Sequence, residues 1–383
     1  MNPIIVSNLN TISDIESAIS KVNNNIGAGL QLQKDSVNKR KGAMHDASRL
    51  QFLVTWARAN PDSYLHFHPA NNMESVLSEM CNYAPGIAAL RMSDGIKIGN
   101  DVISRREALQ RATEKMEHTD SQDFPKIIKG RSIDITCVSG AKLQYLRPLF
   151  TSRSPDAVKD KNGMHIFLQS LMNYINKKDM PLISNDFLKA CSIFTKELFE
   201  NTQEHAVQDH KGVPYITHVE GLIASWLNME ESEYASDFQG HEKLKDFWER
   251  EAEQSSSSRG SEKSLRCFQL SFFDSGPGFA SRITGCKSTE LERDEERKNL
   301  ISCLQKNFTT KRQIGAGQGL PGVLVSLKEI GGLIRIRSGR YSIFNCFKFN
   351  EDEDIFSFND WTEEPLDTVA GVVISLIIPL RRK

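Results

Sequence analysis

The chain has 383 residues, more than one ordinary domain holds, and its apolar (39%) and charged (25%) contents are typical of a globular protein with a sizeable core. Its net charge of −1 gives no overall attraction to nucleic acid or to an anionic membrane. Seven cysteines without any C-x-x-C spacing argue against a disulfide framework and a cysteine zinc site. The chain starts without a signal-peptide pattern, and no apolar run approaches the ~18 residues of a membrane span, so we expect a cytoplasmic protein.

The first half predicts a mixed α/β domain, placed at residues 1–178. Apolar residues at helical spacing and stop signals such as Asn60-Pro61 indicate helices, and short β-rich runs indicate strands. The expected helices cover residues 12–22, 48–59, 73–83 and 105–116, and the expected strands cover residues 3–6, 64–67 and 133–138. No motif here points to a family, so we expect this half to regulate, or to bind a second copy of the chain or another protein.

The second half, residues 179–383, predicts a second α/β domain. It opens with a long amphipathic helix over residues 182–206, and Ser184 and the residues after it offer N-capping side chains near its start. A serine-rich polar stretch at residues 251–263 indicates an insertion, which we place at about 222–263. The remaining expected elements are strands at 267–273, 333–337 and 372–378 and helices at 290–306 and 320–330, the last ended by two glycines.

The first motif with chemical meaning lies on the long helix. Glu197 and Asn201 are four residues apart and project from one face. An amide oxygen suits Mg²⁺, which prefers hard oxygen ligands, and a carboxylate can activate a water for attack on a phosphate. On its own such a pair is more often part of a solvent-exposed helix face.

The second motif, Asp274-Ser275-Gly276-Pro277-Gly278, follows a buried strand. It places one carboxylate at the floor of a cleft, where it can accept a hydrogen bond from an exocyclic amine such as that of adenine. Gly276 and Gly278 let the backbone pass close to a flat base. A plain β-turn is the alternative interpretation.

The third motif is a glycine cluster, Gly315, Gly317 and Gly319, which runs into a helix at Leu320. Free N–H groups and the helix N-terminus favour an anion, and Lys311 upstream can neutralise phosphate charge. Residues 317–322 also match G-x-G-x-x-G, but the preceding residues are polar where a dinucleotide fold needs an apolar strand. No P-loop pattern occurs.

Taken in order, these segments resemble the GHKL superfamily of ATP-binding domains, which includes type II topoisomerase subunits, heat-shock chaperones, mismatch-repair proteins and histidine kinases. ELFENTQEHA resembles its N box, DSGPG its first glycine box, and TTKRQIGAGQGLPGV its second glycine box. GGLIRIRSG and GVVISLIIP resemble its closing strand pair. The resemblance covers about residues 182–380. Two features depart from the family pattern, the long segment between the first two boxes and the stiffening Pro277.

The resemblance implies a two-layer α/β sandwich of GHKL (Bergerat) type, with a mixed sheet, helices on one face, and ATP between the helices and a mobile lid at about residues 279–314. Asn201 would bind Mg²⁺, Glu197 would activate water, and Asp274 would bind the adenine amine. Further ATP contacts would come from His205, Gly276, Gly278, Lys311, Gly315, Gly317, Gly319 and Leu320.

Three uses of ATP follow from the resemblance. The first is slow Mg²⁺-dependent hydrolysis that drives a conformational or assembly switch, which Glu197 favours. The second is phosphotransfer to a histidine as in a histidine kinase, with His45-Asp46 as the candidate acceptor. The third is ATP sensing without turnover, by analogy with GHKL proteins in bacterial stress and phage defence.

His66 and His68 lie on one face of an expected strand, where a metal site is conceivable but a packing or surface role is favoured.

Overall fold

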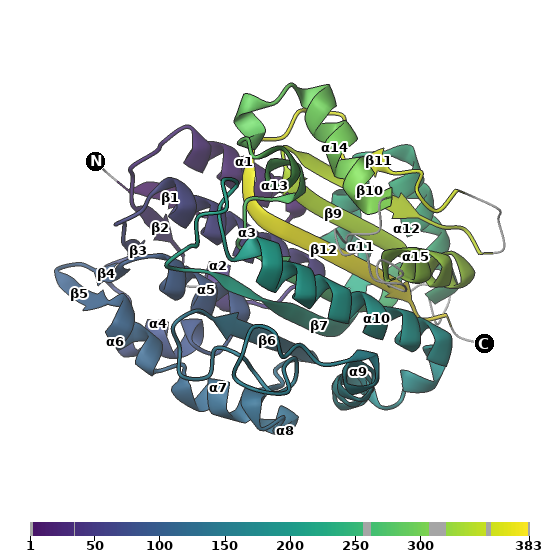
Figure 1. The fold of residues 1–383 in the computed structure, drawn as a ribbon, viewed down its shortest axis with the longest axis horizontal. Helices are drawn as coiled ribbons and strands as arrows, with labels where there is room; N and C mark the ends of the chain where they lie inside the picture. The colour runs from purple at the N-terminus through teal and green to yellow at the C-terminus, as the bar shows by residue number, and fades with distance from the viewer. Residues whose placement is uncertain (1–2, 34, 256–261, 306–318, 350–353, 382–383) are drawn as a thin grey trace.

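The computed structural model describes residues 3–33, 35–255, 262–305, 319–349 and 354–381. Two sheets organise them, as Figure 1 shows. The smaller sheet has the order β1 (Ile4–Val6), β2 (Leu30–Leu32), β3 (Leu65–Phe67), β4 (Gly95–Ile98) and β5 (Asp101–Ser104). Its first four strands are parallel, and β5 returns antiparallel to β4. Helices therefore connect the parallel strands, as this geometry requires.

The larger sheet has seven strands and is antiparallel throughout its described pairs. Its order is β11 (Asn359–Asp360), β10 (Tyr341–Cys346), β9 (Leu333–Gly339), β12 (Val369–Pro379), β8 (Ser264–Asp274), β7 (Val219–Glu230) and β6 (Ser132–Val138). The expected strands at 267–273, 333–337 and 372–378 are all present. The mixed sheet expected for the second half is not observed, because each strand of the larger sheet runs antiparallel to its described neighbours.

Fifteen α-helices are described. Those of the first half are α1 (Ile12–Asn23), α2 (Asp35–Asn38), α3 (Ala43–Ala59), α4 (Met73–Met80), α5 (Ala84–Met92), α6 (Arg105–Gln110), α7 (Thr113–Asp120), α8 (Phe124–Ile127) and α9 (Lys161–Asn176). The others are α10 (Asn185–Asn201), α11 (Glu231–Tyr234), α12 (Glu242–Ser255), α13 (Phe279–Thr284), α14 (Arg293–Gln305) and α15 (Gly319–Ile330). Short 3₁₀ turns cover Met180–Leu182, Ala235–Phe238 and Ser288–Glu290. The helix expected over 105–116 is two helices, α6 and α7.

Both faces of the seven-stranded sheet are covered, whereas helices on one face were expected. Helices α9, α10 and α15 pack on one face, and α3 and α12 pack on the other. The strands alternate accordingly: Phe272 and Ile374 belong to the first core, and Phe273 and Val373 belong to the second. The second core continues through α3 into the five-stranded sheet, so the two halves of the chain share it.

The expected boundary at residue 178 falls inside this arrangement. Strand β6 and helix α9 precede residue 178, but both pack with elements that follow it. Strand β6 pairs with β7 along its whole length, and α9 packs against α10. The first part of the expected insertion is also a core element, because residues 222–230 lie in β7 and pair with β8. Helix α12 occupies residues 242–255, and residues 256–261 lie outside the described part of the chain.

No described helix combines the length and apolarity needed to cross a bilayer.

Two arginines of β9 form ion pairs with a glutamate of α1 and so connect the C-terminal half of the chain to the N-terminal half. Arg337 donates to both carboxylate oxygens of Glu16 on α1 at 2.9 Å, and Arg335 reaches the same carboxylate at 3.4 Å. Both arginine side chains are about 1% exposed. A buried charge without its partner is costly, so α1 and the sheet specify each other's position.

Replacing Glu16 tests this connection. We expect Glu16→Ala to lower the free energy of unfolding by about 3 kcal/mol, because two buried cations lose their anion. Urea denaturation at neutral pH measures the change. Glu363→Ala, which alters an exposed glutamate, is the control and should change it by less than about 0.5 kcal/mol. Equal losses in the two variants would contradict the prediction.

Candidate functional site

A cavity of about 530 Å³ opens between the C-terminal end of α10 and the turn after β8. Four further elements contribute to its walls: α13, α14, the start of β12, and η2 (Thr202–Ala206), the π-helical turn that extends α10. Four of the predicted site residues line it, namely Asn201, His205, Asp274 and Gly278. The fold thus brings together two motifs that lie about 70 residues apart in the sequence.

The long helix that carries the first motif forms as its sequence predicts. The Ser184 side chain accepts a hydrogen bond from the N–H of Phe187 and caps its first turn. The apolar stripe packs on the sheet, with Phe194 edge-on to Phe272 of β8. At its far end, Gln203 in η2 donates to the buried carboxylate of Glu220 at 2.6 Å. π-helical turns are rare and occur frequently at functional sites, and here one forms a wall of the cavity.

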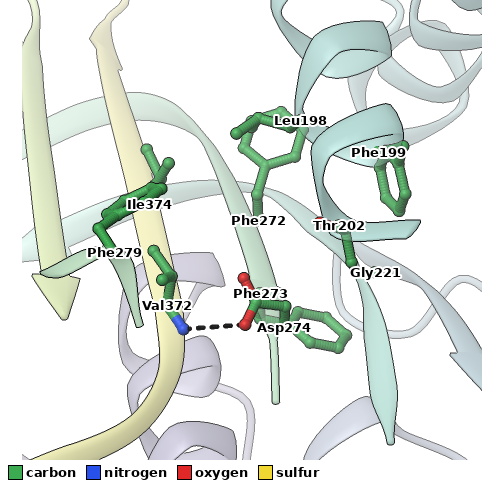
Figure 2. A pocket seen from close by; sticks show the side chains of 10 residues that line it. All are labelled: Leu198, Phe199, Thr202, Gly221, Phe272, Phe273, Asp274, Phe279, Val372 and Ile374. Atoms are coloured by element: carbon green, nitrogen blue, oxygen red, sulfur yellow. Dashed lines mark hydrogen bonds between the residues drawn. The ribbon is translucent and has the colours of Figure 1, made fainter. Parts of the chain in front are cut away.

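Asp274 ends β8 at the cavity floor, between β12 and the end of α10 (Figure 2). Its Oδ1 accepts hydrogen bonds from the N–H groups of Gly276 at 2.8 Å and Val372 at 3.2 Å. Among the described residues, no donor is bonded to the other oxygen, Oδ2. The two backbone bonds fix the carboxylate and leave Oδ2 available to a donor on a ligand.

The pKa of Asp274 is raised to about 6. Burial is the main cause, and the hydrogen bonds from Gly276 and Val372 and the charge of Arg58 partly offset it. Burial also raises the pKa of Glu220 to about 7, and Glu220 faces Asp274 across the β7–β8 pair. Asp274 is therefore mostly ionised at pH 7 and above, where both of its oxygens act only as acceptors.

A narrow space of about 30 Å³ adjoins the cavity beneath Asp274. Figure 2 shows the apolar side chains that bound it, including Leu198, Phe272 and Ile374, and Asp274 and Thr202 are its polar members. The floor of the site is thus an apolar surface with one fixed carboxylate. This arrangement suits a flat ring that carries a single donor group at its edge.

The two glycines of the second motif have different tasks. Gly278 lines the cavity and has a φ of +87°, which a side chain would strain. Gly276 does not line it. A Cβ at Gly276 would lie 2.7 Å from the Cα of Ala206, so this glycine allows the turn to pass directly behind η2. Gly276 therefore has a packing role against η2.

Asn201 lies in the cavity wall, and its Nδ2 is buried without a described hydrogen-bond partner. Since the oxygen and nitrogen of an amide can exchange places by a side-chain flip, either can face the cavity. Magnesium is commonly held by one or two protein oxygens, with water and substrate phosphates as its remaining ligands. Asn201 fits such a site. No group of three or more His, Cys, Asp or Glu residues that could hold a metal occurs among the described residues, His66 and His68 included.

Glu197 points elsewhere. Its Oε2 accepts a hydrogen bond from the N–H of Gly319 at 3.0 Å, at the first turn of α15. A Cβ at Gly319 would lie 2.7 Å from the Cα of Phe194, so only glycine permits this approach. Glu197 and Gly319 therefore join the two helices and do not line the cavity. Leu320 is buried in the core beneath α15 and does not line it either.

The remaining predicted phosphate contacts, Lys311, Gly315 and Gly317, lie outside the described residues.

Two cations near the site were missed by sequence reasoning. Arg282 of α13 lines the cavity and donates to Nδ1 of His205 at 3.4 Å. Arg58, at the end of α3, donates to the carbonyl of Ser275 at 3.0 Å and lies 3.5 Å from the ring centroid of Tyr215. Arg282 follows the second motif by four residues, which is a local signal. Nothing in the sequence around Arg58 indicates its position.

Comparisons with models of protein families, with curated proteins and with solved structures find no significant match to this chain.

Replacing Asp274 by Asn should stabilise the chain in the absence of ligand. The folded carboxyl titrates near pH 6 and the unfolded one near 3.8, so the folded state binds more protons between these values. The ionised carboxylate therefore costs stability above pH 6. We expect Asp274→Asn to raise the free energy of unfolding by about 3 kcal/mol at pH 8 and by about half of that at pH 5.

Urea denaturation at both pH values measures this gain. Asp246→Asn, at an exposed position of α12, is the matched control and should show none. A gain for Asp274→Asn that is the same at pH 5 and pH 8 would contradict the assignment.

Proposed function

We propose that the chain binds ATP with Mg²⁺ in the 530 Å³ cavity and hydrolyses it slowly as part of a conformational switch. The observation that carries the proposal is Asp274, fixed by two backbone bonds at the apolar floor of a cavity of ligand size. The adenine amine would donate to Oδ2 of Asp274. Asn201 would ligate Mg²⁺, and Arg282 and His205 would face the phosphates at the cavity wall.

The order of the motifs around this cavity supports a GHKL-type site. The N-box helix forms one wall, the first glycine box forms the floor, and the helix that follows the second glycine box is bonded to Glu197. Magnesium would supply charge neutralisation at the β- and γ-phosphates. For hydrolysis, the Glu197 carboxylate would take a proton from a water that attacks the γ-phosphorus, and ADP would leave.

The switch follows from the present partner of Glu197. Glu197 does not line the cavity in this conformation, so it would have to turn toward the γ-phosphate to act as a base. The N–H of Gly319 would then lose its acceptor, and α15 would lose its link to α10 at that point. Nucleotide binding and the position of α15 would thus be coupled. A partner or a second copy of the chain would sense this change, and we propose the N-terminal half as its binding surface.

The same bond favours a second candidate, an ATP-sensing module without turnover. A carboxylate that caps a helix has a structural task that needs no water. The kinase alternative loses its candidate acceptor, because His45 is fully buried and its Nε2 lies 2.7 Å from the Asp237 carboxylate. A phosphate acceptor must reach the nucleotide, and His45 in this conformation does not.

Binding is tested by isothermal titration with ATP and Mg²⁺ at pH 8. We expect Asp274→Asn to weaken ATP binding at least tenfold, because the amide can present an N–H to the adenine amine where the carboxylate accepts. Asp246→Asn should bind as the unaltered chain does, and GTP should bind more weakly than ATP. Unchanged ATP affinity in Asp274→Asn would overturn the assignment of the base pocket.

Turnover is tested by phosphate release. We expect Glu197→Gln to reduce the rate at least a hundredfold, the contribution of a general base, while ATP affinity stays within a few-fold. Glu200→Gln, on the same helix and paired with Lys196 at 2.7 Å, is the control and should retain activity. If the unaltered chain binds ATP without releasing phosphate, the sensing module is the correct function. Label from γ-phosphate retained on the chain would indicate a kinase instead.

A further inference from the structure

A second cavity, of about 680 Å³, lies at the same end of the large sheet as Asp274, on the β6 side. The strand register shows that Asp274 and the end of β6 lie at the same end of the sheet. Asp274 pairs with Glu220 at the start of β7, and the adjacent Val219 pairs with Val138 at the end of β6. The cavity opens beyond Val138, between helices α6 and α7 and the loop that follows β6. It shares no lining residue with the proposed ATP cavity.

Cations dominate the lining of this second cavity. They are Arg91, Arg105, Arg106, Lys142, Arg147 and Arg153. Only two carboxylates, Glu117 and Asp120, line it as well, which leaves four positive charges in excess. Since the whole chain has a net charge of −1, this concentration is local and is not a property of the composition.

Asp120 forms ion pairs with two of these cations. Arg147 and Arg153 donate to its carboxylate at 2.8 Å and 2.5 Å. Burial alone would raise the pKa of Asp120, but the hydrogen bonds from Arg153 and Arg147 outweigh it and lower the pKa to about 2. The group stays ionised, and it holds both guanidinium groups in place at one end of the cavity.

The other four cations form no ion pair with a described carboxylate. Arg91 is nevertheless held firmly: it donates to Oγ of Ser139 and to the carbonyl of Ile216, both at 3.1 Å. Burial, and next the charge of Arg105, lower the pKa of Arg91. Like charges placed this close repel one another, and a bound anion would relieve the repulsion.

We propose that this cavity binds a small molecule with at least two phosphate groups. Guanidinium groups match phosphate oxygens in pairs, and four excess charges match a di- or triphosphate. The volume lies in the range of small-ligand sites. A nucleic-acid strand would need cations that continue along a face of the protein, whereas these residues surround one hollow.

The test uses inorganic tripolyphosphate and the full chain, by isothermal titration at about 0.15 M ionic strength. We expect binding with one site per chain, and binding at least tenfold weaker in the double variant Arg105→Ala, Arg106→Ala. The control is Lys177→Ala, Lys178→Ala, which removes two adjacent exposed cations elsewhere and should bind as the unaltered chain does. Equal thermal unfolding temperatures of the variants show that each is folded.

Arg282→Ala distinguishes this site from the proposed ATP cavity, because it removes the guanidinium group that would face phosphates there, and it should leave tripolyphosphate binding unchanged. Loss of binding in that variant, equal binding in the arginine double variant, or no binding by the unaltered chain would each overturn the proposal. A single-stranded oligonucleotide that binds more tightly than tripolyphosphate, with affinity rising with its length, would overturn it in favour of a nucleic-acid surface.

Discussion

Helix α3 carries polar side chains into the middle of the protein, and the fold depends on their being paired. Its residues 43–57 are all buried. His45 is paired with the Asp237 carboxylate, Arg49 donates to the Leu9 carbonyl at 2.8 Å, and the Gln51 amide donates to carbonyls of β9 and β12 at 3.2 and 3.3 Å. An unpaired buried charge or amide costs several kcal/mol, so each of these groups requires one neighbour in one place. Helix α3 thereby fixes the larger sheet against the N-terminal elements.

The same helix supports the candidate site. Arg58 at its end is largely buried, which lowers its pKa to about 10, and it holds the carbonyl of Ser275, the residue after Asp274. The loop before β7 is held too, because Tyr215 lies beneath the same guanidinium group. The proposed nucleotide cavity is built from C-terminal residues, but its floor is braced by the N-terminal half. The halves are therefore mechanically linked at the carboxylate we assign to the base.

Two binding functions are proposed at one end of one sheet. The segment between η2 and β7 leads from the wall of the proposed ATP cavity to Ile216, whose carbonyl accepts a hydrogen bond from Arg91 of the cationic cavity. Both proposed ligands carry phosphates, but the two cavities differ in chemistry. One has an apolar floor with a single carboxylate, and the other is lined by cations, so each would select a different part of a ligand.

Local patterns in the sequence were enough to predict α10 with its Ser184 cap, strand β8 ending at Asp274, helix α15 ended by glycines, and the strands β9 and β12. Each follows from the periodicity of apolar residues and from capping groups within a few positions. Asn201, Asp274 and Gly278 were also identified from their motifs, and the fold brings them to one cavity.

Tertiary structure alone decided the rest. Strand β7 was taken for an insertion because its role depends on a partner about 45 residues away. Glu197 binds Gly319, Leu320 enters the core, and Arg58 reaches the site from the other half, all through contacts across more than 100 residues. Sequence spacing reports which side chains share a face of one element. It does not report which distant group will satisfy a buried charge or N–H, because that is set by how the elements pack.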